Sequence, residues 1–248
     1  MATAAVINSP ADGYTLYFVN AANFINVSLF IKLPFDFLQD MAFVVGIMRV
    51  PNVLEINPSV PAKSVRKLIA YAKANPGKLS MASSGVGTSI HLAGEMFKIM
   101  TGVDLTHVPY KGTPPAVTDI IASHVQVIFD NLPSSVGHIR EGRLRALAVT
   151  TLERAPTMPD LPTVAETVPG YESSSLFGIG APRGTPREII ERLNREVNAA
   201  LADPTIKARL IQMGGILLGG TPEDFGKMSV DEVEKWGRAV RSSGAKAD

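Results

Sequence analysis

The run Ser83-Ser84-Gly85-Val86-Gly87-Thr88-Ser89 has the residue types of an anion-binding loop. It lies between a strand-like stretch and a helix-like stretch, and Thr88 and Ser89 add hydroxyl donors. Glycines let the main chain approach a ligand, and a helix start offers unpaired N–H groups and a favourable dipole. A plain tight turn capped by Thr or Ser explains the same residues, so both interpretations stay open. The glycine spacing fits neither the dinucleotide fingerprint nor a P-loop, which argues against nucleotide binding.

His91 follows this loop, and Glu95 stands four residues later. Such a pair on one helix face could hold zinc or act as a base and its orienting group. However, no second histidine stands nearby in the sequence, and the chain has no G-x-S-x-G nucleophile elbow. We favour a structural histidine that hydrogen-bonds the loop. The sequence therefore predicts no catalytic residue, no metal and no cofactor.

Two further polar segments come directly after predicted strands. Tyr110-Lys111-Gly112 offers an aromatic hydroxyl and a cation, and Asp130 ends the next strand. Ligands of open α/β sheets bind beyond the carboxyl ends of the strands. An ordinary loop with a solvated lysine, and an aspartate that caps a turn, remain the alternatives.

These segments need a scaffold of alternating strands and helices. Hydrophobic periodicity and Gly/Pro signals place the strands and helices along the chain. Strands are expected over 14–19, 43–48, 53–57, 79–83, 105–108, 125–130, 146–150 and 176–181, and helices over 64–75, 90–100, 114–122, 186–202, 204–213 and 222–242. This is an α/β pattern with many short crossovers.

The composition of the 248 residues excludes several classes of protein. The chain has no cysteine, its 24 Lys and Arg balance 23 Asp and Glu, and 46% of its residues are hydrophobic. It is therefore neither disordered, nor a disulfide scaffold, nor a basic nucleic-acid-binding domain. No basic segment followed by a long apolar stretch marks a signal peptide, and the apolar run 41–48 is too short to span a bilayer.

Several short motifs, taken together in this order, resemble one family. They are Asp-Gly-Tyr-Thr-Leu at 12–16, Leu-Pro-Phe-Asp at 33–36, Asn-Pro-Ser-Val-Pro-Ala-Lys-Ser at 57–64, Asn-Pro-Gly-Lys-Leu at 75–79, Ser-Ser-Gly-Val-Gly-Thr-Ser-Ile-His-Leu-Ala-Gly-Glu at 83–95, His-Val-Pro-Tyr-Lys-Gly at 107–112, Phe-Asp-Asn-Leu-Pro at 129–133, Leu-Arg-Ala-Leu-Ala-Val-Thr at 144–150, Leu-Pro-Thr-Val-Ala-Glu at 161–166 and Gly-Gly-Thr-Pro-Glu at 219–223. Over essentially its whole length the chain is similar to the Bug family. These are the TctC-like extracytoplasmic solute receptors of tripartite tricarboxylate transporters.

The resemblance implies a type II periplasmic-binding-protein fold, in which two α/β lobes flank a ligand cleft. By analogy the chain crosses between the lobes near Asn52 and near residues 174–176. Residues 1–52 and 176–248 would form the first lobe, and residues 53–175 the second. We expect a monomer that is not inserted into a membrane.

The resemblance also implies which residues hold the ligand, a small carboxylate in most of the family. Backbone N–H groups and hydroxyls would bind it without a full salt bridge, and lobe closure would bury it. The expected contacts are Ser84, Gly85, Gly87, Thr88, Ser89, Tyr110, Lys111 and Gly112, with Asn20, Asn23 and Asp130 on the side that sets specificity.

Two features depart from the family pattern. Asn20-Ala21-Ala22-Asn23 replaces a stretch that relatives often write Ser-Gly-Thr-His, which implies a different ligand. Relatives also begin with an export signal, a strand, a Gly-Gly loop and a helix, and this sequence begins within that helix. We therefore expect a first lobe that lacks its N-terminal strand, loop and helix, and a periplasmic location for the full-length exported form.

Three function classes remain to be compared. The leading class is a solute-binding module that delivers a carboxylate to the membrane permease subunits of a tripartite transporter. A sensory or orphan receptor of the same fold would instead dock a sensor protein. An enzyme that acts on a small carboxylate, with His91 as base, would give turnover where a binding protein gives only a saturable shift in melting temperature.

Overall fold

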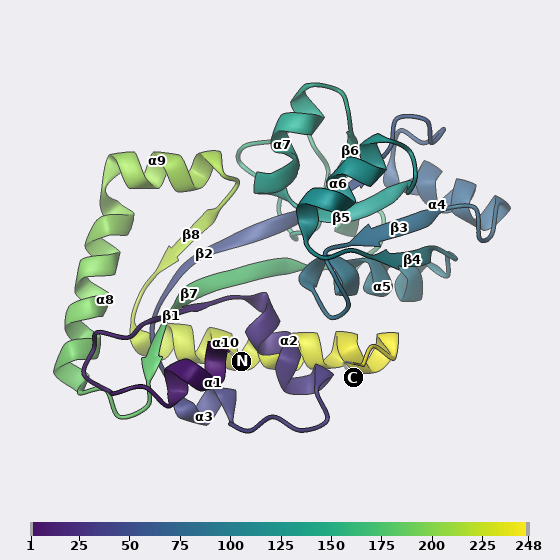
Figure 1. Cartoon of the computed structure of the whole chain (residues 1–248). Coiled ribbons are helices and arrows are strands. Elements are labelled where there is room, and N and C mark those ends of the chain that lie inside the picture. Colours follow the sequence, from purple (N-terminus) through teal and green to yellow (C-terminus); the bar gives the residue numbers. More distant parts are fainter. Residues whose placement is uncertain (1, 247–248) are drawn as a thin grey trace. The chain divides into compact units, whose positions relative to one another are not determined.

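In this computed structural model, residues 2–246 are described, and they divide into two compact units. Unit 1 comprises Met1–Val50, Ser175–Arg241 and Lys246–Asp248, and unit 2 comprises Pro51–Ser174 and Ser242–Ala245. Figure 1 labels the helices and strands of both. Within residues 2–246, no helix is long and apolar enough to cross a membrane. The lobes expected at 1–52 with 176–248 and at 53–175 stay a prediction.

Unit 1 is built on a small sheet with β7 in its interior. β1 (Tyr17–Val19) pairs antiparallel with β7 (Ser174–Pro182), and β7 lies between β1 and β2 (Met41–Ile56). β8 (Ile216–Gly219) pairs antiparallel with β2.

Six helices of the described chain belong mainly to unit 1. They are α1 (Ala2–Ile7), α2 (Ala21–Leu29), α3 (Phe37–Asp40), α8 (Arg187–Ala202), α9 (Pro204–Gln212) and α10 (Pro222–Ser243). The apolar stripe expected on the helix over 186–202 is confirmed, because Ile190, Leu193 and Val197 pack with Val44 and Val45 of β2.

β2 corrects the expectation of two separate strands over 43–48 and 53–57. It runs without a break through Pro51, which has no N–H to donate to a sheet. Before Pro51 the strand pairs with β8 as far as Arg49. After Pro51 it pairs with β5 from Asn52 and with β6 from Val53. Pro51 therefore lies where the strand changes partners, and the absence of its N–H removes the fewest hydrogen bonds between strands there.

The sheet of unit 2 contains a parallel core. β3 (Ser80–Ser83) lies between β4 (Thr106–Pro109) and β5 (Val127–Asn131), parallel to both. The end of β2 pairs antiparallel with β5 and with β6 (Arg145–Val149).

Helices cover both faces of this sheet. α4 (Val65–Ala74) and α5 (Ser89–Thr101) pack on one face, where Leu68 and Phe97 contact the main core cluster. α6 (Thr113–Ile121) packs on the other face through Ala116 and Ile120. The fourth helix, α7 (Leu132–Arg140), follows β5, and a 3₁₀ turn spans Val164–Glu166.

The parallel core brings three helix starts to one edge. β3, β4 and β5 each lead through a short connection into α5, α6 and α7 (Figure 1). Parallel neighbours end on the same side of a sheet, so the connections 84–88 and 110–112 and the start of α7 share this edge. The fold therefore places the glycine-rich loop beside the Tyr110 segment.

Candidate functional site

The loop between β3 and α5 has a fixed, hydrogen-bonded shape. Gly85 and Gly87 have positive φ angles of 134° and 75°, a conformation that L side chains rarely adopt. Thr88 caps α5, since its hydroxyl oxygen accepts the His91 N–H at 3.3 Å, and the same hydroxyl donates to the Gly85 carbonyl at 2.8 Å. The cap by Thr or Ser that the sequence offered as an alternative is present at Thr88, and its hydroxyl is engaged within the loop.

Main-chain hydrogen bonds tie this loop to the segment after β4. Tyr110 N–H donates to the Ser83 carbonyl at 2.9 Å, and Gly112 N–H donates to the Ser84 carbonyl at 3.1 Å. The two backbones lie so close that a Cβ added at Gly85 would stand 3.4 Å from the Tyr110 carbonyl oxygen. The structure thus brings together the two segments that the sequence singled out.

Several loop N–H groups are already used, which limits what the site can offer an anion. The N–H groups of Gly85, Gly87 and Thr88 donate within the loop and to His91. Among the described residues, the N–H groups of Val86 and Ile90 have no acceptor. They stand on either side of the start of α5, where the helix dipole favours negative charge.

The side chains around these N–H groups add little formal charge. Ser84 makes no side-chain hydrogen bond to any described residue, Ser89 opens α5 and is 9% exposed, and Lys111 is exposed. Tyr110 donates its hydroxyl to Asp119 at 2.7 Å, and burial together with that carboxylate raises the pKa of Tyr110 to about 12. The phenol therefore stays neutral, and its hydroxyl is directed to α6.

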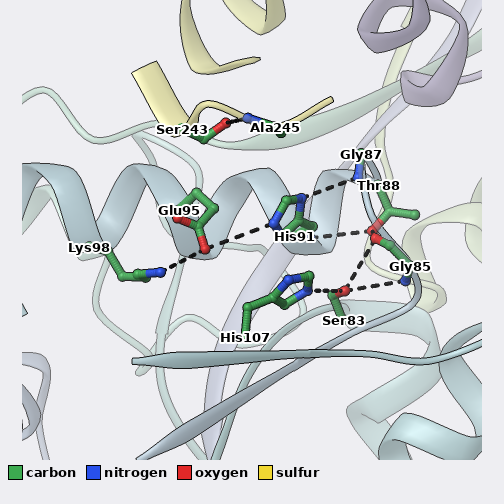
Figure 2. Close-up of polar contacts among 10 residues, drawn as sticks. All are labelled: Ser83, Gly85, Gly87, Thr88, His91, Glu95, Lys98, His107, Ser243 and Ala245. Atoms are coloured by element: carbon green, nitrogen blue, oxygen red, sulfur yellow. Dashed lines mark hydrogen bonds and ion pairs between the residues drawn. The ribbon is translucent and has the colours of Figure 1, made fainter. Parts of the chain in front are cut away.

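A pair of stacked histidines lies beside the loop (Figure 2). His91 Nδ1 accepts the Gly87 N–H at 3.2 Å, so the prediction of a structural histidine that hydrogen-bonds the loop is confirmed. His107 Nε2 lies 2.7 Å from Ser83 Oγ. His107 was missed as a site residue and Ser83 was named only as the first residue of the run, because their contact depends on the pairing of β3 with β4, in which His107 lies opposite Met81 and Ser83 opposite Pro109. No group of three His, Cys, Asp or Glu in the described chain is placed to hold a metal ion.

Asp130 lies beneath the surface and is held by its own neighbours. Its carboxylate accepts hydrogen bonds from Ser134, Ser135 and the Asn131 N–H, at 2.8, 2.6 and 2.8 Å. The side chain is fully buried. Burial is the main reason that its pKa is raised, and the three hydrogen bonds counteract that rise. These bonds hold the Asp130 side chain locally, whereas the N-cap of α7 is Asn131, which makes no side-chain capping hydrogen bond. The expected contact of Asp130 with a ligand stays a prediction.

Asn20 and Asn23 belong to unit 1 and form a reciprocal cap at the start of α2. Asn20 Oδ1 accepts the Ala22 N–H at 3.0 Å, and Asn23 Oδ1 accepts the Asn20 N–H at 2.8 Å. Asn23 also donates to the Tyr17 hydroxyl at 2.7 Å. Both side chains are thus engaged locally, and their expected contact with a ligand stays a prediction.

Comparison with protein families gives a match over nearly the whole sequence. Residues 1–245 match the model of the tripartite tricarboxylate transporter family receptor, TctC. Protein BugT of Bordetella pertussis is 36% identical over 247 residues, which cover 98% of this chain and 76% of BugT.

Solved structures show the same likeness. R. palustris Rpa4515 with adipate gives a TM-score of 0.92 at 39% identity, over 99% of this chain and 83% of that one. MatC (Rpa3494) from Rhodopseudomonas palustris with bound malate gives 0.85 at 28% identity, over 96% and 83%. The fold is the mixed α/β fold of periplasmic binding proteins, and the family consists of solute receptors rather than enzymes. The chain belongs to the TctC family of tripartite tricarboxylate transporter receptors.

Proposed function

We propose that this protein binds a small carboxylate at the loop between β3 and α5. The observation that carries the proposal is the open start of α5. There, within the described residues, the N–H groups of Val86 and Ile90 lack acceptors beside a loop whose shape is fixed by its other hydrogen bonds. A carboxylate placed there would receive the helix dipole and main-chain donors together.

Main-chain donors would dominate this site, and Lys111 would contribute little. The lysine is exposed, so water and salt screen its charge. Ser84, Ser89 and Gly112 would complete the contact set, while Thr88, Gly85 and Gly87 would hold the loop in shape. Tyr110 would act mainly through its main chain, which joins the two loops.

A dicarboxylate is the ligand class that we propose. Adipate and malate, bound in Rpa4515 and MatC, are both dicarboxylates. From membership of the family we further propose that the protein works outside the cytoplasmic membrane and delivers its ligand to the membrane subunits of a tripartite transporter.

Titration calorimetry with adipate, malate, citrate and the neutral compound adipamide tests the binding proposal. We expect saturable binding of at least one of the acids and none of the diamide. Gly85→Ala should weaken that binding by about 10-fold or more, because an L residue strains the φ of 134° that gives the loop its shape.

Gly102→Ala is the matched control. Gly102 also has a positive φ, 67°, but it lies at the opposite end of α5, where an added Cβ meets nothing within 4 Å. This variant should lose comparable stability and keep the affinity of the parent protein. If none of the three acids binds to folded protein, or if both variants bind equally well, this site is wrong.

A further inference from the structure

His91 and His107 form a stacked pair that contacts both ends of the candidate loop. Their ring centroids lie 4.0 Å apart with an angle of 24° between the planes. His91 comes from the first turn of α5, and His107 comes from β4 (Figure 2). His91 is 5% exposed, and a polar ring buried to this extent is normally hydrogen-bonded within the protein.

The hydrogen bond from Gly87 fixes the protonation state of His91. Nδ1 can accept the Gly87 N–H only without a proton of its own, so a neutral ring must carry its proton on Nε2. Nε2 lies 3.8 Å from Glu95 Oε1, on the side away from the loop. Burial is the main reason that the pKa of His91 falls to about 4, and His107 and Lys98 add to the effect.

The second ring reaches the other end of the loop through Ser83. His107 Nε2 lies 2.7 Å from Ser83 Oγ, and that oxygen lies 3.2 Å from both the N–H and the carbonyl of Gly85. The stack therefore links Gly85, through Ser83, to Gly87 on the far side of Val86. Val86 carries one of the two N–H groups that lack an acceptor in the described chain.

We propose that His91 is a positioning residue whose neutral Nδ1, backed by the stacked His107, holds Gly87 and thereby orients the Val86 and Ile90 N–H groups for the carboxylate. The inference rests on the proposed function and adds that pH controls the affinity for the carboxylate. Protonation of His91 puts a hydrogen where the Gly87 N–H must donate, so the loop loses this anchor and affinity falls in acid.

The charged groups around the pair come from a small set. α5 contributes Glu95 and Lys98, which bond to each other at 2.9 Å, and β4 contributes His107 itself. The loop and β3 contribute only the neutral Ser83, Ser84 and Thr88. Lys98 opposes a positive charge on either ring, while Glu95 favours one on His107.

Two substitutions at His91 distinguish the effect of a hydrogen-bond acceptor from the effect of side-chain volume. In His91→Asn the Oδ1 atom can take the place of Nδ1, accept the Gly87 N–H and never titrate. His91→Leu fills similar space without an acceptor. At about pH 7.5 we expect the Asn variant to bind adipate within about 3-fold of the parent protein and the Leu variant to bind at least about 10-fold more weakly, as for loss of one buried hydrogen bond.

The pH profile provides a readout that a purely structural role would not change. Comparison of the parent with His91→Asn at each pH cancels the protonation of adipate itself. The Kd of the parent divided by the Kd of His91→Asn should stay constant above about pH 6. This ratio should rise several-fold as pH approaches about 4, where His91 gains its proton. A flat ratio, or a ratio that falls because a charged His91 aids binding, overturns the proposal.

Amide exchange in the ligand-free protein tests the anchor without any ligand. His91→Leu should speed exchange of the Gly87 N–H by about 10-fold or more, while the Gly102 N–H, which donates to Lys98 at 2.8 Å, should not change. Unchanged exchange at Gly87 overturns the positioning role, whatever the outcome of ligand binding. Faster exchange, together with a parent protein that binds none of the acids tested, overturns the proposed function and leaves the anchor established.

Discussion

Glu55 places a carboxyl group in the interior of unit 2. The side chain is fully buried, and among the described residues neither Oε atom has a hydrogen-bond partner within 3.5 Å. In the β2–β5 register Glu55 stands opposite Ile128 and Val53 opposite Asp130, so the two acids are diagonal neighbours on one face. Burial, and then the charge of Asp130, raise the pKa of Glu55 well above its ordinary value. The Glu55 carboxyl group is therefore protonated and neutral in the folded protein.

Glu55→Gln should therefore make the free energy of unfolding less dependent on pH. An acid whose pKa is higher in the folded state holds its proton there while the unfolded chain releases it. Stability consequently falls as pH rises above the ordinary value near 4.5. The slope can reach about 1.4 kcal/mol per pH unit for one group, and glutamine removes it. Urea denaturation of both proteins between about pH 5 and about pH 8 measures the difference; parallel pH curves would show that Glu55 ionises freely in the fold.

Asp130 shows why site residues are harder to predict than elements. The strand that it ends was expected over 125–130 and is found over Val127–Asn131. An acid at a strand end can face a ligand or fold back under the next helix, and the sequence offers both. Here Ser134 and Ser135 of α7 turn their hydroxyls to its carboxylate, but this helix was not predicted. Without α7 the burial of Asp130 could not be foreseen.

At the scale of the element, α5 combines a binding role at its start with packing along its length. Thr88 closes the first turn, and Gly94 and Phe97 face the sheet, where Phe97 lies 5.4 Å, between ring centroids, from Phe129. The far end stops at Gly102 in a left-handed conformation. The first turn can therefore be altered separately from the packed face.

Removal of the Thr88 hydroxyl should affect both stability and binding. Thr88→Ala loses the cap and the bond to the Gly85 carbonyl, at a cost of about 1 kcal/mol in unfolding free energy, and should weaken carboxylate binding several-fold. Ser64→Ala removes the matching cap of α4, whose hydroxyl oxygen accepts the Lys67 N–H at 3.2 Å. That control should cost the same stability and leave affinity unchanged; calorimetry that finds equal affinities in the two variants would separate Thr88 from the site.

Gly94 tests how closely α5 packs on β3. A Cβ at this position would overlap the sulfur of Met81, whereas a Cβ at Gly137 of α7 meets nothing within 4 Å. Gly94→Ala should lower the unfolding free energy by about 1–3 kcal/mol through overpacking. Gly137→Ala should leave it unchanged or raise it by up to about 1 kcal/mol, because alanine favours a helix. Urea denaturation that ranks the two variants in the opposite order would contradict this packing.

Two of the helices that the sequence failed to predict, α2 and α7, have weak local signals. α2 carries no charged residue, and its cap uses Asn23 at the third helical position in place of the usual Glu or Gln. α7 has Pro133 as its second residue and contains Ser134, Ser135 and Gly137, which are poor helix formers. Tertiary packing supplies what local preference lacks, as Leu132 and Val136 pack with Val53 of β2. The helices over 186–202 and 222–242, with strong apolar stripes, were predicted to within one or two residues.

At the scale of the whole molecule, charge balance and anion binding are compatible. The formal net charge is only +1, so net charge contributes little to the attraction of anions. The candidate site relies instead on main-chain N–H groups and on the dipole of α5, which act over a few ångströms. Lys111, in the segment that is hydrogen-bonded to the loop between β3 and α5, is exposed.

Carboxylate binding should accordingly depend weakly on salt. Raising NaCl from about 50 mM to about 500 mM shortens the screening length several-fold, yet short contacts to main-chain donors persist. We expect the Kd for adipate, measured by calorimetry, to rise by less than about 3-fold, and Lys111→Gln to remove most of that rise. Lys63→Gln, which alters an exposed lysine before α4, is the control and should keep the salt response of the parent protein. A Kd that rises by more than about 10-fold would mean that side-chain charges, rather than the helix start, hold the ligand.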